Sequence, residues 1–207
     1  MKEAQLIAAG LVKDVQEGSN LSKIFQKHTK KNKINQKNKA QIKDLVYGTL
    51  RSYGKTKFII NKLVKRTPSN LLILNLLHVA LFQLISNRSN SYTVVDQIVS
   101  ASNMISKSHT GFINGVLRTF LRKKETLLEE SQNVLEAKYS YPIWWINQIK
   151  TEYPKAWQNI LDVGNSHPAL IIRVNLRKTS INKYAKKLET QNVEHLLLGY
   201  EAILIKK

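Results

Sequence analysis

A mostly apolar run at residues 71–85, LLILNLLHVALFQLI, constrains the fold of this chain more than any other segment. The run is shorter than the roughly 20 residues that a helix needs to cross a lipid bilayer. It also contains Asn75, His78 and Gln83, whose polar groups need hydrogen-bond partners. A helix that is apolar on nearly all sides is typical of the centre of a helical protein. We therefore predict that this run forms a buried central helix.

Apolar residues repeat at helical spacing on both sides of the central run. These stripes begin at Leu6, Leu21, Ile42, Phe58 and Val94. Thr67 followed by Pro68 predicts the start of the central helix, with the threonine as its cap and the proline in its first turn. A lysine-rich segment at residues 28–39, HTKKNKINQKNK, predicts a polar bridge between two helices. We expect residues 1–135 to form one helical bundle.

The segment GFINGVLRTFLR, residues 111–122, predicts another helix of this bundle. Its apolar residues recur at i, i+4 and i+8 and predict a stripe that faces the core. Gly111 and Gly115 lie four residues apart and predict the close approach of a neighbouring helix. Such an approach would offset the cost of roughly 1 kcal/mol for a glycine inside a helix. Arg118 and Arg122 fall on another face, which we expect to contact solvent or a partner.

The pattern changes beyond residue 140. Pro142 and Pro154 stand where helices can begin. Three tryptophans follow in this region, and we expect them to pack as apolar anchors rather than to stack on bases. They are Trp144, Trp145 and Trp157.

The last part of the chain predicts strands. Residues 169–176, ALIIRVNL, are rich in β-branched side chains, and two short apolar runs follow at 193–198 and 202–205. Ser180 is a suitable cap for a helix between the first two of these strands. So small a sheet exposes its edges and is marginal alone, so we expect the chain to stop short of a complete subdomain.

The expected fold class is mainly α, in three parts. A helical bundle is predicted over residues 1–135, linker helices over 136–165, and an incomplete small α/β subdomain over 166–207.

The charge distribution favours a polyanionic partner. The chain has 33 Lys and Arg against 14 Asp and Glu, a formal net charge of +19. Between residues 18 and 95 the single acidic residue is Asp44, and residues 163–188 contain no acidic residue. Clustering of this kind favours nucleic acid over a generally basic surface of solvated lysines. An anionic membrane is a weaker candidate, because no segment joins a basic face to a strongly apolar exposed one.

Other classes of site find little support in the sequence. The chain has no cysteine, which excludes disulfides and thiol nucleophiles, and it has no glycine-rich phosphate loop. The five histidines do not show metal-ligand spacing, and His78 is expected to be a hydrogen-bonded core residue. Asp96 is expected to form a salt bridge. The N-terminus lacks the long apolar stretch of a secretory signal, so a cytoplasmic location is expected.

Four segments resemble the NusB-type RNA-binding domain. They are LVYGTLR at 45–51, VALFQLI at 79–85, VVDQIV at 94–99 and GFINGVLRTFLR at 111–122. That all-helical domain occurs as a free transcription antitermination factor. It also occurs as the N-terminal part of the bacterial 16S rRNA cytosine-C5 methyltransferase family called RsmB or Sun.

Two further features resemble the methyltransferase branch. In the free factor an acidic residue usually follows NGVL, whereas Arg118 stands there in this chain. YPIWWI, YPKAWQNIL, the N-x-x-P pattern at 165–168 and RVN at 173–175 resemble that family's linker helices and the opening of its small α/β subdomain. The chain is therefore identified as a member of the methyltransferase family over essentially all of its length.

The resemblance implies that RNA binding and catalysis belong to different parts of the family's proteins. Members of the family add a cysteine thiolate to cytosine C6 and transfer a methyl group from S-adenosylmethionine. This chain lacks the cysteine and a glycine-rich cofactor turn, and it stops where the family's catalytic domain would begin. It is expected to be the RNA-binding N-terminal region, to bind 16S rRNA, and to have no catalytic, cofactor-binding or metal-binding residues and no activity alone. A separate catalytic methyltransferase chain is a further candidate partner.

Cations in the basic windows are the candidate contacts to RNA phosphates. They are Lys30, Lys31, Lys33, Arg51, Lys55, Lys57, Arg118 and Arg122 in the bundle, and Arg173 and Arg177 in the last subdomain. Alternatively, the arginines of the 111–122 segment pair with Glu125, Glu129 or Glu130.

Three other functions stay open at this point. The chain could be a non-enzymatic antitermination factor that binds RNA together with a ribosomal protein. It could be the product of a degenerate gene, or one half of a split enzyme whose second chain docks on the exposed strands.

Overall fold

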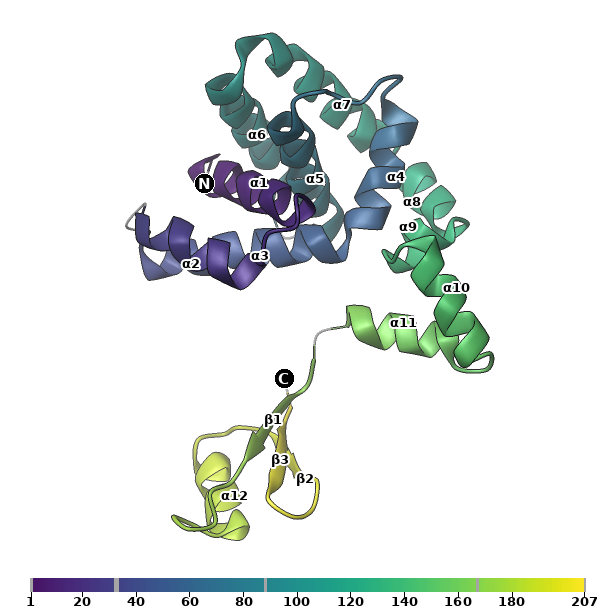
Figure 1. Ribbon diagram of the computed structural model, residues 1–207. Coiled ribbons are helices and arrows are strands. Elements are labelled where there is room, and N and C mark those ends of the chain that lie inside the picture. Colours follow the sequence, from purple (N-terminus) through teal and green to yellow (C-terminus); the bar gives the residue numbers. More distant parts are fainter. Residues whose placement is uncertain (1, 32–33, 88, 167, 207) are drawn as a thin grey trace. The chain divides into compact units, whose positions relative to one another are not determined.

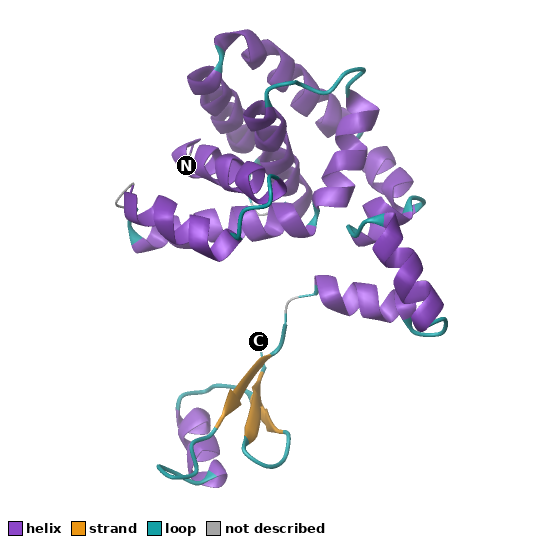
Figure 2. Ribbon diagram, in the orientation of Figure 1, coloured by secondary structure: helices purple, strands orange, loops and turns teal. Residues whose placement is uncertain are grey.

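The structure is a computed structural model that describes residues 2–31, 34–87, 89–166 and 168–206. The chain divides into two compact units, Met1–Leu161 and Asp162–Lys207. Figure 2 shows that the described part of the first unit is helical, whereas the strands lie in the second. The predicted fold class, mainly α with a small α/β part, is confirmed.

The bundle of the first unit is formed by the following helices (Figure 1). They are α1 (Lys2–Gln16), α2 (Leu21–Lys31), α3 (Gln36–Arg51), α4 (Tyr53–Leu63), α5 (Leu71–Ser86), α6 (Ser91–Ile105), α7 (Thr110–Arg122) and α8 (Lys124–Gln132). A 3-10 turn, Lys107–His109, joins α6 to α7. Three shorter helices follow: α9 (Leu135–Tyr139), α10 (Ile143–Glu152) and α11 (Trp157–Asn165).

Helix α5 is the predicted central helix, and it packs against α1, α3, α4, α6 and α7. It begins after Asn70, whose Oδ1 accepts hydrogen bonds from the backbone N–H groups of Leu72 and Ile73 at 3.0 and 3.3 Å. The predicted start at Thr67 and Pro68 is therefore wrong, because the side chain that satisfies the free amides of the first turn lies further along. No helix in the described residues has the length and apolar character needed to cross a membrane.

Two of the three buried polar side chains in α5 bond to α1. Asn75 Nδ2 donates to Gln16 Oε1 at 3.2 Å, and Gln83 Oε1 accepts from Gln5 Nε2 at 2.8 Å. Both α5 side chains are buried. A buried amide without a partner is costly, so these bonds fix the rotation of α1 against α5.

His78, the third, bonds to α4. Its Nδ1 lies 2.7 Å from Thr56 Oγ1, and its ring stacks on Tyr53 with centroids 4.3 Å apart. Burial, and to a lesser extent the positive charge of Lys57, lower the pKa of His78 to about 3. The prediction of a hydrogen-bonded core histidine is confirmed.

We expect the bundle to lose stability in acid because of His78. Its folded-state pKa of about 3 lies below the unfolded value of 6.5, so below pH 6.5 the unfolded chain binds a proton that the folded chain does not. The stabilisation is complete above pH 6.5 and is lost as the pH falls from 6.5 towards 3. Between about pH 7 and about pH 5 the loss should be about 2 kcal/mol in the free energy of unfolding.

Urea unfolding followed by circular dichroism at several pH values measures this loss. His78→Asn is the control, because the amide can bond to Thr56 but does not titrate. If wild type and His78→Asn lose the same free energy over this pH range, His78 is not the cause.

The lysine-rich segment at 28–39 is mostly helical rather than a polar bridge, which corrects that prediction. Helix α2 continues to Lys31, and α3 begins at Gln36. Asn35 Oδ1 accepts from the backbone N–H of Asn38 at 2.8 Å and so caps α3. One capping side chain is enough to start α3, so the helix forms in spite of the many lysines around it.

Close approaches between helices lie at Gly48, against the Phe82 ring, and at Gly54, but not at Gly111 or Gly115. A Cβ added at either α7 glycine meets nothing within 4 Å in the described structure, so the prediction for this pair is wrong. At Gly54 in α4 an added Cβ would overlap the carbonyl oxygen of Glu136 and lie 2.9 Å from the Cα of Ser140. Gly54 therefore allows α9 to pack directly on the α4 backbone.

A second small core joins α9, α10 and α11 within the first unit. Trp157 packs there edge-on against Tyr139, with ring centroids 5.5 Å apart. Trp144 and Trp145, in contrast, are 67% and 37% exposed, so the predicted packing holds for Trp157 alone of the three. Helix α10 turns Ile146 inward, which leaves the two neighbouring tryptophans on its outer side.

The second unit is a three-stranded antiparallel sheet with one helix. Strands β1 (Leu170–Arg173), β2 (His195–Leu197) and β3 (Ala202–Ile205) take the order β1-β3-β2, and α12 (Ile181–Thr190) lies between β1 and β2 in the sequence. Ile203 is buried and pairs with Ile172 on one side and Leu197 on the other. Ser180 Oγ accepts from the backbone N–H of Lys183 at 3.3 Å, which confirms the predicted cap.

Candidate nucleic-acid interface

Helix α7 presents Arg118 and Arg122 to solvent because its other side is committed to the core. Ile113, Val116 and Phe120 are buried on that side, as the apolar spacing predicts. Arg118 and Arg122 are one helical turn apart on an exposed face. Gly111 and Gly115 lie on the same face with open space around them, so a partner could approach the α7 backbone there.

Both arginines bond only to neutral oxygens. Arg118 Nε donates to Asn114 Oδ1 at 3.1 Å, and Arg122 Nη2 donates to Thr119 Oγ1 at 3.0 Å. Within the described ranges neither arginine forms an ion pair, and Glu130 pairs instead with Lys62 of α4 at 2.8 Å. Pairing of the arginines with Glu125, Glu129 or Glu130 is therefore not seen. The positive charges of α7 are available to an external anion.

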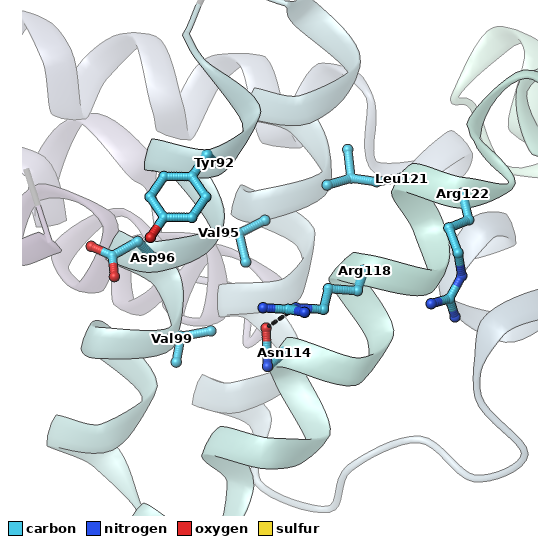
Figure 3. Close-up of a pocket in the computed structure, with 8 residues that line it drawn as sticks. All are labelled: Tyr92, Val95, Asp96, Val99, Asn114, Arg118, Leu121 and Arg122. Carbon is cyan, nitrogen blue, oxygen red and sulfur yellow. Dashed lines mark hydrogen bonds between the residues drawn. The ribbon is translucent and has the colours of Figure 1, made fainter.

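A groove of about 630 Å³ lies between α6 and α7 beside these arginines. Figure 3 shows its residues: Tyr92, Val95, Asp96 and Val99 from α6, and Asn114, Arg118, Leu121 and Arg122 from α7. The Arg118 guanidinium extends into the space that faces α6, whereas Arg122 points away on the other side of α7. The groove thus combines an apolar floor with charged walls.

Asp96 has a different environment from the one predicted. Among the described residues it makes no ion pair, so the expected salt bridge is wrong. Its side chain is exposed and lines the groove one helical turn after Tyr92. At the groove no cation among the described residues reaches the carboxylate, which is left to solvent.

Lys124 has a structural role that distinguishes it from the arginines before it. Its Nζ donates to the carbonyl oxygen of Leu84 at 2.8 Å and to Asn87 Oδ1 at 2.6 Å. These groups lie at the C-terminal end of α5, where Asn87 adopts a left-handed conformation with φ 52°. A cation stabilises the negative end of the helix dipole and satisfies a free carbonyl group.

The other predicted cations of the first unit lie elsewhere on the bundle. Arg51 ends α3 and is exposed, and Lys55 and Lys57 follow on α4. Lys30 is exposed on α2, which packs on α1 at the opposite side of this unit from α7 (Figure 1). Lys33 and the side chain of Lys31 lie outside the described residues.

In the second unit, Arg173 and Arg177 differ in their partners. Arg173 Nε donates to Glu201 Oε2 at 2.6 Å, which neutralises part of its charge. Arg177 is exposed in the turn after β1, where its backbone N–H bonds to Asn175 Oδ1 at 3.0 Å. Both line a hollow of about 440 Å³. Arg177 is the better candidate of the two for an anionic ligand.

The structure places Arg118 and Arg122 one helical turn apart on α7 and the remaining candidates of the first unit on other helices. Sequence reasoning missed Tyr92 and Asn114. The i, i+4 spacing from Asn114 to Arg118 on α7, and from Tyr92 to Asp96 on α6, was the available signal. That the two helix faces border one groove could not be read from spacing.

The described residues show no recognisable site for S-adenosylmethionine or a metal ion. The sequence has no cysteine, and no glycine lies between β1 and α12, where a cofactor turn would follow a strand. In the described ranges no three His, Asp or Glu side chains are grouped to hold a metal ion.

Two family models match parts of the chain. Residues 2–122 match the NusB family, and residues 141–207 match the Methyltr_RsmF/B-like, ferredoxin-like domain. The crystal structure of PH0851 superimposes on 100% of this chain and 49% of its own, with a TM-score of 0.61 and 18% sequence identity. At that identity the likeness shows the fold alone.

The chain is also similar in sequence to named proteins of other bacteria. The probable ribosomal RNA small subunit methyltransferase B of Coxiella burnetii is 35% identical over 162 residues, 77% of this chain and 38% of that protein. The corresponding protein of Cronobacter sakazakii is 31% identical over 187 residues, 89% of this chain and 43% of that protein. The chain thus spans less than half the length of these relatives. On the match over more than half of its residues the chain belongs to the NusB family, and its likeness to the ribosomal RNA small subunit methyltransferase B proteins extends over most of its length.

Proposed function

We propose that this chain is the rRNA-binding region of a 16S rRNA cytosine-C5 methyltransferase. The observation that carries the proposal is the exposed face of α7, where two arginines lie beside a groove without a carboxylate partner among the described residues. Arginine offers several N–H donors in a fixed plane and suits phosphate oxygens. The net charge of +19 and the family of the chain support RNA as the anion.

The other assignments of this proposal follow the same family. Residues 1–135 act as the RNA-binding bundle, 136–165 as linker helices, and 166–207 as part of an α/β subdomain. Lys30, Lys31, Lys33, Arg51, Lys55 and Lys57 add phosphate contacts on the bundle, and Arg177 and Arg173 add contacts on the subdomain. The site of action is the cytoplasm. Methyl transfer requires a catalytic domain with S-adenosylmethionine, on the same or a separate chain, and is not assigned to these residues.

Replacement of Arg118 and Arg122 by alanine tests the proposal. We expect the double variant to bind 16S rRNA fragments about tenfold more weakly at low salt, because two phosphate contacts and their counterion release are lost. Filter binding or fluorescence anisotropy measures the affinity. Lys2→Ala with Lys155→Ala is the matched control, since it removes the same charge from exposed positions outside the interface. If the two double variants bind RNA with equal affinity, α7 is not part of the interface.

A transcription antitermination factor is the second candidate, favoured by the NusB match over residues 2–122. It predicts selective binding to a short single-stranded leader RNA. Competition between such a leader and 16S rRNA fragments separates the two functions, because the factor prefers the leader and the methyltransferase region prefers rRNA.

A further inference from the structure

The groove between α6 and α7 contains more than phosphate binding needs. Tyr92 is 79% exposed at its rim, so one face of the ring is open for stacking. Val95, Val99 and Leu121 form an apolar floor. Proteins bind unpaired bases by stacking them on aromatic rings while cations hold the backbone. Tyr92 and Arg118 supply these two elements on opposite sides of the groove.

The size of the groove fits a nucleotide. Small-molecule sites usually measure roughly 300 to 1,000 Å³, and this groove measures about 630 Å³. Arg118 is held at its Nε by Asn114, which leaves the terminal Nη groups of the guanidinium to bind a phosphate. A base that enters between the helices would therefore keep its phosphate at the α7 wall.

Asp96 restricts which part of the nucleotide can face α6. Its carboxylate repels a phosphate and accepts hydrogen bonds only, so the group opposite it must be a donor. Guanine is the base whose Watson–Crick edge carries two adjacent donors, N1–H and the N2 amine. The two oxygens of a carboxylate match this pair, whereas adenine, cytosine and uracil each carry a single donor group on that edge and can match only one oxygen.

We propose that this groove binds a single unpaired guanine of the RNA, stacked on Tyr92, with its Watson–Crick edge at Asp96 and its phosphate at Arg118. The proposal rests on the proposed RNA binding and adds base selectivity to it. It makes Asp96 the residue that determines specificity, and the cations the residues that determine affinity.

Binding of oligouridines with one central guanosine, inosine or adenosine tests this site. The probe is a labelled RNA of about ten nucleotides, which covers the groove and its flanking cations. We expect guanosine to be preferred over adenosine by about tenfold, as for a two-bond contact to a base edge. Inosine, which lacks the N2 amine, should lie between them. Asp96→Asn should abolish the preference and leave binding of plain oligouridine equal or stronger.

Glu129→Gln is the matched control for Asp96→Asn, because it removes one negative charge from an exposed position on α8. It should keep the preference for guanosine. Tyr92→Ala should weaken binding of the guanosine RNA about tenfold, and Tyr92→Phe should not, since stacking needs the ring and not the hydroxyl. Inosine needs no change to the protein, so a folding defect cannot mimic its effect.

The possible results distinguish the guanine site from the general RNA binding on which it rests. Equal affinities of the wild type for all oligonucleotides would overturn the guanine site and leave phosphate-driven RNA binding intact. A preference that persists in Asp96→Asn also overturns it, since another residue then reads the base. Absence of any RNA binding at low salt overturns both proposals.

Discussion

Binding of this protein to 16S rRNA fragments should weaken by about 10³- to 10⁵-fold when monovalent salt rises from about 50 to about 200 mM. This range applies to six to ten phosphate contacts, each of which releases condensed counterions when it forms. Arg118, Arg122, Arg51, Lys57 and Lys30 are exposed and can supply such contacts from the bundle. Anisotropy titrations at several salt concentrations give the slope of log K against log [salt].

The same titrations assign part of the slope to α7. Each phosphate contact contributes about 0.9 to the slope, so Arg118→Ala with Arg122→Ala should reduce it by about 2. The Lys2→Ala, Lys155→Ala control should keep the wild-type slope. An affinity that changes less than about threefold over this salt range would show that phosphate contacts do not dominate the interface.

Gly54→Ala should lower the free energy of unfolding of the first unit by about 3 kcal/mol, because the added methyl group has no room between α4 and α9. The atoms it meets belong to the backbone at Glu136 and Ser140, which cannot rotate away as a flexible side chain could. The contact between Lys55 N–H and Ser140 Oγ, at 3.4 Å, lies beside this overlap. We expect α9 to move away from α4.

Tryptophan fluorescence detects this displacement specifically, because Trp144, Trp145 and Trp157 all lie in the helices that directly follow α9. The urea concentration at the midpoint of the tryptophan fluorescence transition should fall more than the midpoint measured by helical circular dichroism. Gly115→Ala is the control: it has open space, and it should stabilise the protein by up to about 1 kcal/mol through helix propensity. Similar effects of the two substitutions would contradict the packing at Gly54.

Much of the fold could be predicted from local patterns in the sequence. The apolar run at 71–85 predicts a buried helix because no exposed helix tolerates apolar residues on nearly every side, and α5 occupies that position. The stripe of α7 follows from helical period, and the strands at 170–173 and 202–205 follow from β-branched and apolar content. The charge windows indicate a polyanion, since charge density depends on composition and hardly on packing.

Boundaries and individual roles depended on groups that are distant in sequence. Asn70 rather than Thr67 caps α5, because only one of these side chains reaches the free amides of the first turn. Lys124 and Arg122 look alike in the segment TFLRKK. Lys124 bonds to the C-terminal end of α5, whereas Arg122 stays available to an external anion. Sequence spacing gives no measure of such a difference.

The glycines and the groove show the same limit most directly. Gly111 and Gly115 have the spacing of a helix contact, yet the contact forms at Gly54, where α9 returns to α4 from far along the chain. Tyr92 and Asp96 line the same groove as Asn114 and Arg118 only because α6 and α7 pack side by side. The sequence by itself determined which helices form and that their surface is basic, because both follow from local composition and period. The tertiary structure alone decided which cations, which carboxylate and which glycine meet a neighbour, because that depends on how distant helices pack.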